Sequence, residues 1–227
     1  MERMIGLLEN RLVPVTDTIG FLQCPAEVLK SAFLDWQRPL QEPRGTLLHE
    51  QRVAGSLEAI LRRLLPLTSV EARRFLFIPT QTDWTAFFDN GHQGTDAFAP
   101  ISYLAKEIGC VGVRATDALP GRTQGGTVFE LYSPEDTDWL NVVRSISAAP
   151  TDGRWAFSAS GTALSFETIE FYAKKRIKDR FNSEILKQYL EELAIDAFNP
   201  DFYAKEGFLI EKVGTCAPAM QLFGLAD

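Results

Sequence analysis

The stretch that decides the fold is FLFIPTQTDWTAFFDNGHQGTD, residues 75–96. Large apolar side chains point alternately to opposite sides at its start, which predicts a strand over 74–78 that is covered on both faces. A short loop and a return strand over 84–88 complete a central hairpin. The small polar and acidic residues that follow predict a loop at one edge of the core, where a functional site would lie.

The rest of the chain supplies more strands and several amphipathic helices. In chain order we expect a strand over 12–15, a helix after Pro25, a strand over 46–53, a helix capped by Ser56, a helix capped by Thr95 or Asp96 and closed by Gly109, hairpins within 110–160, a long helix over 165–181, a second helix capped by Asn182 and a strand over 208–213. Short turns dominate the middle, and they favour antiparallel pairing. The pattern predicts an α+β fold, a mainly antiparallel sheet built from hairpins with helices packed on one face.

The domain organisation follows from length and from the lack of linkers. The 227 residues would allow one large domain or two small ones. Neither an internal repeat nor a long linker divides them. We expect one α+β domain over 1–227, with an N-terminal βαβα subregion over 1–70, a sheet core over 71–162 and a C-terminal helical segment over 163–227.

Composition and charge restrict the class of protein. Hydrophobic residues make up 45% of the chain, the net charge is −7 and the pI is about 5.0. An acidic chain lacks the basic footprint of a general nucleic-acid binder, and it suits a basic protein partner. No apolar run approaches the roughly 20 residues of a membrane span. We therefore expect a cytoplasmic protein without membrane association, and the sequence leaves its oligomeric state undetermined.

Three cysteines, Cys24, Cys110 and Cys216, are scattered along the chain. Their odd number and wide spacing match neither a disulfide framework nor a zinc knuckle, which agrees with a reducing compartment. The sequence contains no cofactor fingerprint and no metal-ligand set that we can complete. We therefore expect neither a cofactor nor a metal.

The polar loop contains the strongest candidate residues for chemistry. His92 lies between Asp89 and Asp96, so it could act as a general base or share a metal with a carboxylate. A simpler interpretation is that Asn90 and Gly91 form a turn, that Asp96 caps the next helix and that His92 is solvated. Turn chemistry of this kind is routine, and we favour it.

Two other segments have both a functional and an ordinary interpretation. The glycine-rich run over 120–126 could cradle a phosphate, but a strand rather than a helix follows it, so a hairpin loop is favoured. The basic cluster over 174–180 could contact an anion. Its spacing on the predicted long helix favours an ordinary solvated face.

Two hypotheses for function come from different classes. The favoured one is a non-enzymatic binding protein that occludes a partner, by analogy with small immunity or inhibitor proteins. Its predicted binding residues are Asp83, Trp84, Asp89, Asn90 and Arg114. The alternative is a small enzyme of unknown class with an acid/His site in the 89–96 loop. There His92 would be the base, Asp89 or Asp96 would orient it, and Arg114 would hold an anionic substrate.

Overall fold

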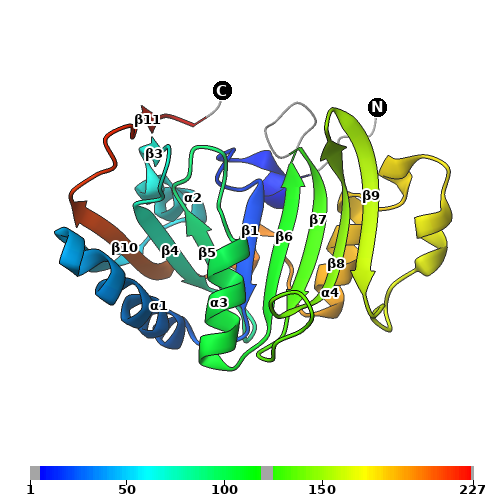
Figure 1. The fold of residues 1–227 in the computed structure, drawn as a ribbon, viewed down its shortest axis with the longest axis horizontal. Helices are drawn as coiled ribbons and strands as arrows, with labels where there is room; N and C mark the ends of the chain where they lie inside the picture. Colours follow the sequence, from blue (N-terminus) through cyan, green and yellow to red (C-terminus); the bar gives the residue numbers. More distant parts are fainter. Residues whose placement is uncertain (1–5, 119–124, 226–227) are drawn as a thin grey trace.

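A large antiparallel sheet forms the centre of the molecule. The computed structural model describes residues 6–118 and 125–225, and all that follows refers to them. Within these ranges nine strands hydrogen-bond in the order β2-β10-β4-β5-β1-β6-β7-β8-β9 (Figure 1). Every neighbouring pair in this sheet is antiparallel. The α+β class and the antiparallel sheet are therefore confirmed.

The bounds of the elements are as follows. The large sheet contains β1 (Thr18–Leu22), β2 (Thr46–Ala54), β4 (Arg74–Pro79), β5 (Thr85–Asp89), β6 (Gly112–Ala118), β7 (Gly126–Tyr132), β8 (Val142–Thr151), β9 (Arg154–Gly161) and β10 (Glu206–Gly214). A second small sheet pairs β3 (Leu67–Thr68) with β11 (Leu222–Phe223). The α-helices are α1 (Ala26–Gln41), α2 (Leu57–Leu61), α3 (Phe98–Ile108) and α4 (Ser183–Glu192). The 3-10 helices are η1 (Leu7–Asn10), η2 (Glu42–Arg44), η3 (Arg62–Leu64), η4 (Ile169–Ala173), η5 (Ile177–Asp179) and η6 (Pro200–Phe202).

The predicted central hairpin is present as β4 and β5. Leu76 pairs with Phe88, and Phe77 pairs with Phe87. Leu76 and Phe88 belong to the hydrophobic core on one side of the sheet, whereas Phe77 and Phe87 belong to the core on the other side. All four side chains are fully buried. The prediction of a strand covered on both faces is confirmed.

Helices cover both faces of the sheet, and not one face as expected. Helices α1 and α3 pack on one face, against β4, β1 and β6, and lie in front of the sheet in Figure 1. Helices α2 and α4 contribute to the core on the opposite face. The physical reason is that the central strands are apolar on both sides, so each side must be shielded from water.

Helix α3 approaches β1 closely because glycine lies beneath it. A Cβ atom at Gly20 would lie 2.6 Å from the side chain of Ile101. Gly112 on β6 is similarly crowded, since its Cβ would lie 2.7 Å from the same side chain. Farther along, Trp36 of α1 stacks on Tyr103 of α3, with ring centroids 4.5 Å apart. The two helices therefore form one layer with the sheet beneath them.

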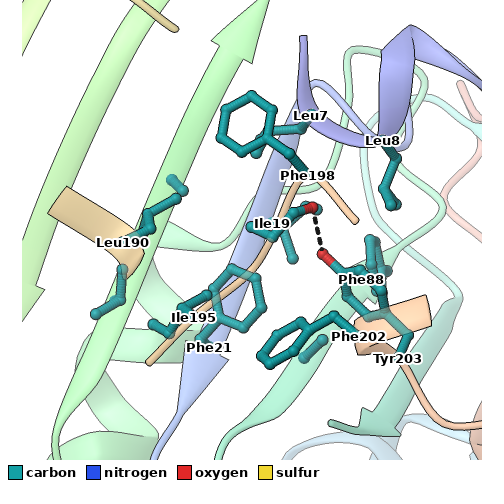
Figure 2. Packing of buried hydrophobic residues seen from close by; sticks show 14 of the residues in the cluster. Leu7, Leu8, Ile19, Phe21, Phe88, Leu190, Ile195, Phe198, Phe202 and Tyr203 are labelled. Atoms are coloured by element: carbon teal, nitrogen blue, oxygen red, sulfur yellow. Dashed lines mark hydrogen bonds between the residues drawn. The ribbon is translucent and has the colours of Figure 1, made fainter. Parts of the chain in front are cut away.

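The opposite face is covered by segments from both halves of the chain. Figure 2 shows Leu7 and Leu8 of η1 together with Phe198 and Tyr203, residues that follow α4, over the central strands. The hydroxyl of Tyr203 donates to the carbonyl oxygen of Ala197 at 2.9 Å. The aromatic residues between α4 and β10 therefore dock the C-terminal part of the chain on the sheet.

Two predicted elements are wrong. The strand expected over 12–15 is a turn, and β1 begins only at Thr18. The long helix expected over 165–181 is absent, and η4 and η5 occupy part of that range. The basic cluster therefore has no helical face. Its Lys178 and Arg180 instead lie over the rings of Trp155 and Phe157 on the edge strand β9, at 4.3 and 5.8 Å from the ring centres.

Two further observations complete the fold. None of the helices in the described ranges combines the length and the apolar character that a bilayer crossing requires. Most of the glycine-rich run, residues 120–124, lies outside the described residues, so its two interpretations stay predictions.

Candidate functional site

An open cavity of about 380 Å³ lies on the α1 side of the sheet, beside the end of β5. We call it the polar groove, and we define it as the cavity bounded by the second half of α1, residues 68–72, residues 91–96 and the end of β10. One wall is aromatic and contains Phe33, Trp36 and Phe75. The charged and titratable side chains that line it are Glu71, Asp89, His92, Asp96 and Lys212.

Asp89 is fixed at the base of the groove by two backbone groups. The residue ends β5 and is 1% exposed. Its Oδ1 accepts the N–H of Gly91 at 2.8 Å, and its Oδ2 accepts the N–H of Asp96 at 3.0 Å. Burial raises the pKa of Asp89 to about 7, although these two hydrogen bonds act in the opposite direction. Asp89 is therefore a buried carboxyl that titrates near neutral pH.

The same contacts explain why the predicted helix cap is wrong. The N-cap of α3 is Ala97, which has no side-chain cap. The backbone N–H of Asp96 binds Asp89, while the hydroxyl of Thr95 donates to the carbonyl oxygen of Val15 at 3.1 Å. The Thr95 hydroxyl also accepts the N–H of Asp89 at 3.3 Å, so both residues close the loop onto β5.

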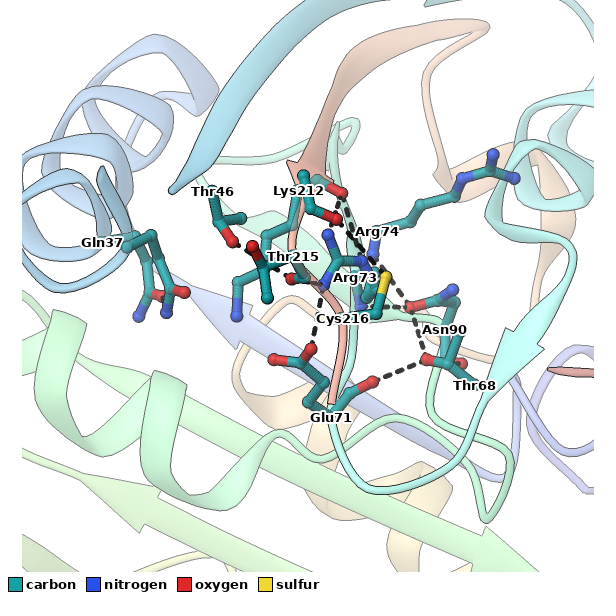
Figure 3. A network of polar contacts seen from close by, with 12 residues as sticks. Gln37, Thr46, Thr68, Glu71, Arg73, Arg74, Asn90, Lys212, Thr215 and Cys216 are labelled. Atoms are coloured by element: carbon teal, nitrogen blue, oxygen red, sulfur yellow. Dashed lines mark hydrogen bonds and ion pairs between the residues drawn. The ribbon is translucent and has the colours of Figure 1, made fainter. Parts of the chain in front are cut away.

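Asn90 anchors the loop to the beginning of β4 (Figure 3). Its Oδ1 accepts the N–H groups of Arg73 and Arg74 at 2.7 and 2.9 Å, and its Nδ2 donates to the carbonyl oxygen of Pro66 at 2.8 Å. The residue is 1% exposed. Its amide therefore holds the ends of β4 and β5 in place. The turn after Asn90 is closed by the N–H of Gly94, which donates to the carbonyl oxygen of Gly91 at 3.1 Å.

Arg73 ties the remaining wall of the groove together. Its buried guanidinium binds Glu71 at 2.9 Å, the carbonyl oxygen of Lys212 at 2.8 Å and that of Thr215 at 2.9 Å (Figure 3). These contacts link residues 71–73 to the end of β10. The orientation of Glu71 is therefore fixed before any ligand arrives.

Lys212 is the cation of the groove. Alternation along β10 places it on the same face as Phe208 and Ile210, and its Nζ lies 5.1 Å from the centre of the Phe75 ring. Burial lowers the pKa of Lys212, and the carboxylates of Glu71 and Asp89 oppose this effect. The ammonium thus lies in a partly desolvated position beside an aromatic face.

His92 lies at the rim, in contact with β11. Its backbone N–H donates to the carbonyl oxygen of Thr68 at 3.0 Å, and its imidazole ring stacks on Phe223 with centroids 4.9 Å apart. The Asp96 side chain is exposed. The structure therefore brings the three predicted catalytic candidates, Asp89, His92 and Asp96, to the same groove.

The structure places three of the predicted binding residues elsewhere. Trp84 is buried, and its Nε1 donates to the carbonyl oxygen of Leu193 at 2.8 Å. Asp83 is exposed before β5 begins, so the whole strand, roughly 17 Å at about 3.3 Å per residue, separates it from the groove. Arg114 pairs with Glu130 at 2.8 Å and lies over the Phe98 ring. None of these three lines the groove.

Sequence patterns missed several groove residues. Trp36, Glu71 and Lys212 all line the groove, and none of them is among the site residues predicted from the sequence. These residues come from segments far apart in the chain, and no local motif joins them. One signal was available for Lys212, because alternation with Phe208 and Ile210 indicates that it shares their face.

The chemistry of the groove is that of an acidic, partly aromatic cavity. Three carboxyl groups, from Glu71, Asp89 and Asp96, face one ammonium group, from Lys212. In the part of the chain that the structure describes, no cluster of three or more His, Cys, Asp or Glu side chains could hold a metal ion. The arrangement can bind a cation, and it can exchange a proton at Asp89.

Comparison with known proteins adds no functional information beyond this geometry. No family model matches the chain, and neither a curated protein nor a solved structure matches it at a significant level.

Proposed function

We propose that this is a non-enzymatic binding protein, of immunity or inhibitor character, that occludes a basic partner by holding one of its lysine or arginine side chains in the polar groove. The observation that carries this proposal is the lining of the groove. Three carboxyl groups, of Glu71, Asp89 and Asp96, line it beside one ammonium group, of Lys212, while the buried guanidinium of Arg73 already pairs with Glu71. Aromatic faces stand beside these carboxyl groups.

The chemistry of the groove suits an amine or a guanidinium. A cation gains from an aromatic face and from charge-assisted hydrogen bonds to carboxylates, and both gains grow where water is partly excluded. The volume of about 380 Å³ lies at the lower end of the range for ligand sites, roughly 300–1,000 Å³. It accommodates one long side chain, with the surrounding surface left to contact the rest of the partner.

Long-range electrostatics supports the same proposal. The net charge of −7 attracts a basic protein from a distance and raises the rate of encounter. Asp83 contributes to this general field, but it lies outside the groove. Local recognition is therefore assigned to the carboxyl groups of the groove, Asp96, Glu71 and ionised Asp89, and general attraction to acidic residues elsewhere.

A specific observation favours a second candidate, an enzyme that uses the same groove. The pKa of Asp89 is raised to about 7 and that of Lys212 is lowered. A carboxyl group that titrates near neutrality, as Asp89 does, is suited to general acid–base work. In this alternative Asp89 would exchange the proton, and His92 would contact the substrate at the rim. It ranks second because His92 stacks on Phe223 and has no orienting carboxylate among its described contacts.

The test uses short peptides as probes of the groove. Binding of a lysine- and arginine-containing peptide is measured by calorimetry, with a glutamate-containing peptide of equal length as the reference. We expect the basic peptide to bind and the glutamate peptide not to bind. We expect Asp96→Asn to lower the affinity for the basic peptide several-fold. The matched control is Asp83→Asn, which removes the same charge from an exposed residue at the other end of β5 and should leave the affinity nearly unchanged.

Three results would count against the proposal. Equal losses of affinity in Asp96→Asn and Asp83→Asn would mean that the peptide responds to overall charge and not to the groove. No binding, or a preference for the glutamate peptide, would contradict a cation site. Mass spectrometry would detect any covalent change in the peptide. Such a change, if His92→Ala and Asp89→Ala abolished it, would favour the enzyme.

A further inference from the structure

Two of the three cysteines meet at one end of the sheet. Cys24 follows β1 and Cys110 precedes β6, and these strands are antiparallel neighbours. Leu22 pairs with Gly112, and the N–H of Gln23 donates to the carbonyl oxygen of Val111 at 2.9 Å. One further step in this register would bring Cys24 opposite Cys110.

The position within the ladder brings the two side chains close together. The chain begins to turn here, because the N–H of Cys24 donates to the carbonyl oxygen of Leu22 at 2.9 Å. In a regular ladder the pair after Gln23 and Val111 would be of the non-hydrogen-bonded kind, with Cα atoms about 4.5 Å apart. Disulfides need Cα atoms about 4.4–6.8 Å apart. Both cysteines belong to the core on the α1 and α3 side, and the two thiols are close enough for each to shift the pKa of the other.

We propose that Cys24 and Cys110 are a redox modification site, and that they form a reversible cross-strand disulfide when the protein meets a small-molecule disulfide such as oxidised glutathione. The pair lies outside the polar groove, and this inference does not rest on the proposed function. The third cysteine, Cys216, is exposed in the C-terminal segment after β10 and serves as an internal reference.

Exposure and hydrogen bonding assign a role to each sulfur. Cys110 is half-buried and Cys24 is only 7% exposed, so a reagent reaches Cys110 first. The hydrogen bond with Cys24 lowers the pKa of Cys110, whereas the same bond and burial raise the pKa of Cys24. Because the thiolate is the attacking species, Cys110 is the nucleophile and Cys24 is the resolving thiol.

The exchange balances in two steps. The Cys110 thiolate attacks one sulfur of oxidised glutathione, forms a mixed disulfide and releases one glutathione thiolate. Cys24 then loses its proton and attacks the Cys110 sulfur, and the second glutathione leaves as a thiolate. The protein loses two hydrogens overall, and the oxidised glutathione is reduced to two molecules of glutathione, which take up the protons.

The crosslink would join the residue before the cap of α1 to the residue after the C-cap of α3. The N-cap of α1 is Pro25 and the C-cap of α3 is Gly109. The helices already contact each other through the stacked rings of Trp36 and Tyr103. The bond therefore links parts that the native fold already holds together, and we expect it to form in the folded protein.

The test is oxidation of the full-length folded chain by oxidised glutathione. Thiols are counted after denaturation, and the site is located by mass spectrometry of peptides under non-reducing conditions. We expect Cys24 and Cys110 to be lost together as one crosslinked peptide, and we expect reduced glutathione to restore them. Circular dichroism before and after the reaction checks that the protein stays folded.

Single variants separate the two roles. Cys24→Ser should stop at a stable glutathione adduct on Cys110, whereas Cys110→Ser should leave Cys24 unmodified over the same time. Cys216→Ser should leave the crosslink unchanged. The inference would be overturned if wild-type protein kept both thiols, if Cys110 accumulated a glutathione adduct without a crosslink, or if the crosslink involved Cys216.

Discussion

Asp89 and Lys212 line the same groove from strands that are not neighbours, because β4 lies between β5 and β10. Each stabilises the charged form of the other, yet burial has the larger effect on both. The pKa of Asp89 is raised to about 7, and that of Lys212 is lowered. In the groove, burial disfavours the charged forms of both groups, and the attraction between their opposite charges only partly offsets this effect.

The buried carboxyl of Asp89 predicts a dependence of stability on pH. An unfolded Asp ionises near pH 4, whereas the folded protein keeps this proton up to about pH 7. Between these values the folded state holds a proton that the unfolded chain has released. Stability should therefore fall as pH rises through this window, by up to about 1.4 kcal/mol per pH unit, and should level off above it.

The measurement is the free energy of unfolding by urea at several pH values, compared between wild type and Asp89→Asn. The amide cannot accept both backbone N–H groups, so a constant loss of about 1–3 kcal/mol is expected in addition. The difference between the two curves isolates Asp89, because Asp117, whose pKa is raised to about 6, titrates in both proteins. Parallel curves would contradict the prediction.

Binding of a cationic peptide should become stronger as pH rises. Ionised Asp89 attracts the cation and protonated Asp89 does not, so the affinity should increase up to about tenfold between pH 6 and pH 8 and then level off. Calorimetry at fixed ionic strength measures this. Asp89→Asn should flatten the profile, and His92→Gln should retain the rise. A profile that disappears only in His92→Gln would assign the effect to the imidazole instead.

Removal of the groove cation should favour a cationic ligand. Lys212→Met keeps the side-chain bulk against Phe75 and removes the charge. At a pH high enough to keep Asp89 ionised in both proteins, the basic peptide should therefore bind several-fold more tightly. The pKa of Asp89 should rise further, because the ammonium of Lys212 lowers it in the native protein. Carboxyl NMR shifts report that pKa directly.

Lys30 provides the control for this substitution. Its Nζ lies 4.9 Å from the ring centre of Phe208, on the same face of the sheet, but Lys30 does not line the groove. Lys30→Met should leave both the peptide affinity and the Asp89 pKa nearly unchanged. A similar response in both variants would mean that the effect is one of total charge.

The ion pair of Arg144 and Glu167 should matter far more to stability than an exposed pair. Its N–O distances are 2.8 and 2.6 Å, and the side chains are 5% and 0% exposed. Tyr172 also donates to Glu167 at 2.8 Å. Glu167→Gln leaves a buried guanidinium without its counter-charge, so we expect a loss of about 3–5 kcal/mol in the free energy of unfolding.

The pair of Lys106 and Asp136 offers the comparison. It is equally short, at 2.7 Å, but its side chains are 50% and 66% exposed. Asp136→Asn should therefore cost less than about 1 kcal/mol. Urea unfolding of both variants decides the matter, and similar losses would show that burial does not control the strength of these pairs.

Local signals predicted many elements correctly where the responsible groups are close in sequence. Ser56 accepts the N–H of Ala59, and Asn182 accepts those of Glu184 and Ile185, as their cap positions predict. Gly109 ends α3 in the left-handed region, with φ at 75°. Each of these helix ends depends on contacts within one helical turn, so the local sequence is sufficient to predict it.

Local signals failed where distant partners compete. Asp96 resembles a helix cap, but its N–H is held by the buried Asp89. Residues 165–181 show helical spacing, yet Glu167 is needed by Arg144 of β8, and the segment follows the sheet instead. A contact of this kind outweighs helix propensity, which amounts to only a few tenths of a kcal/mol per residue.

By itself, the sequence determined the α+β class, the central hairpin and the residues of the polar loop, because alternation and turn chemistry act between near neighbours. Only the tertiary structure decided that both faces are covered and that Lys212, Glu71 and Trp36 join Asp89 in one groove. It also brought Cys24 and Cys110 to the same end of the β1–β6 pair. The reason is physical: strand order and register bring together residues far apart in the chain, and a single sequence shows no local trace of that order.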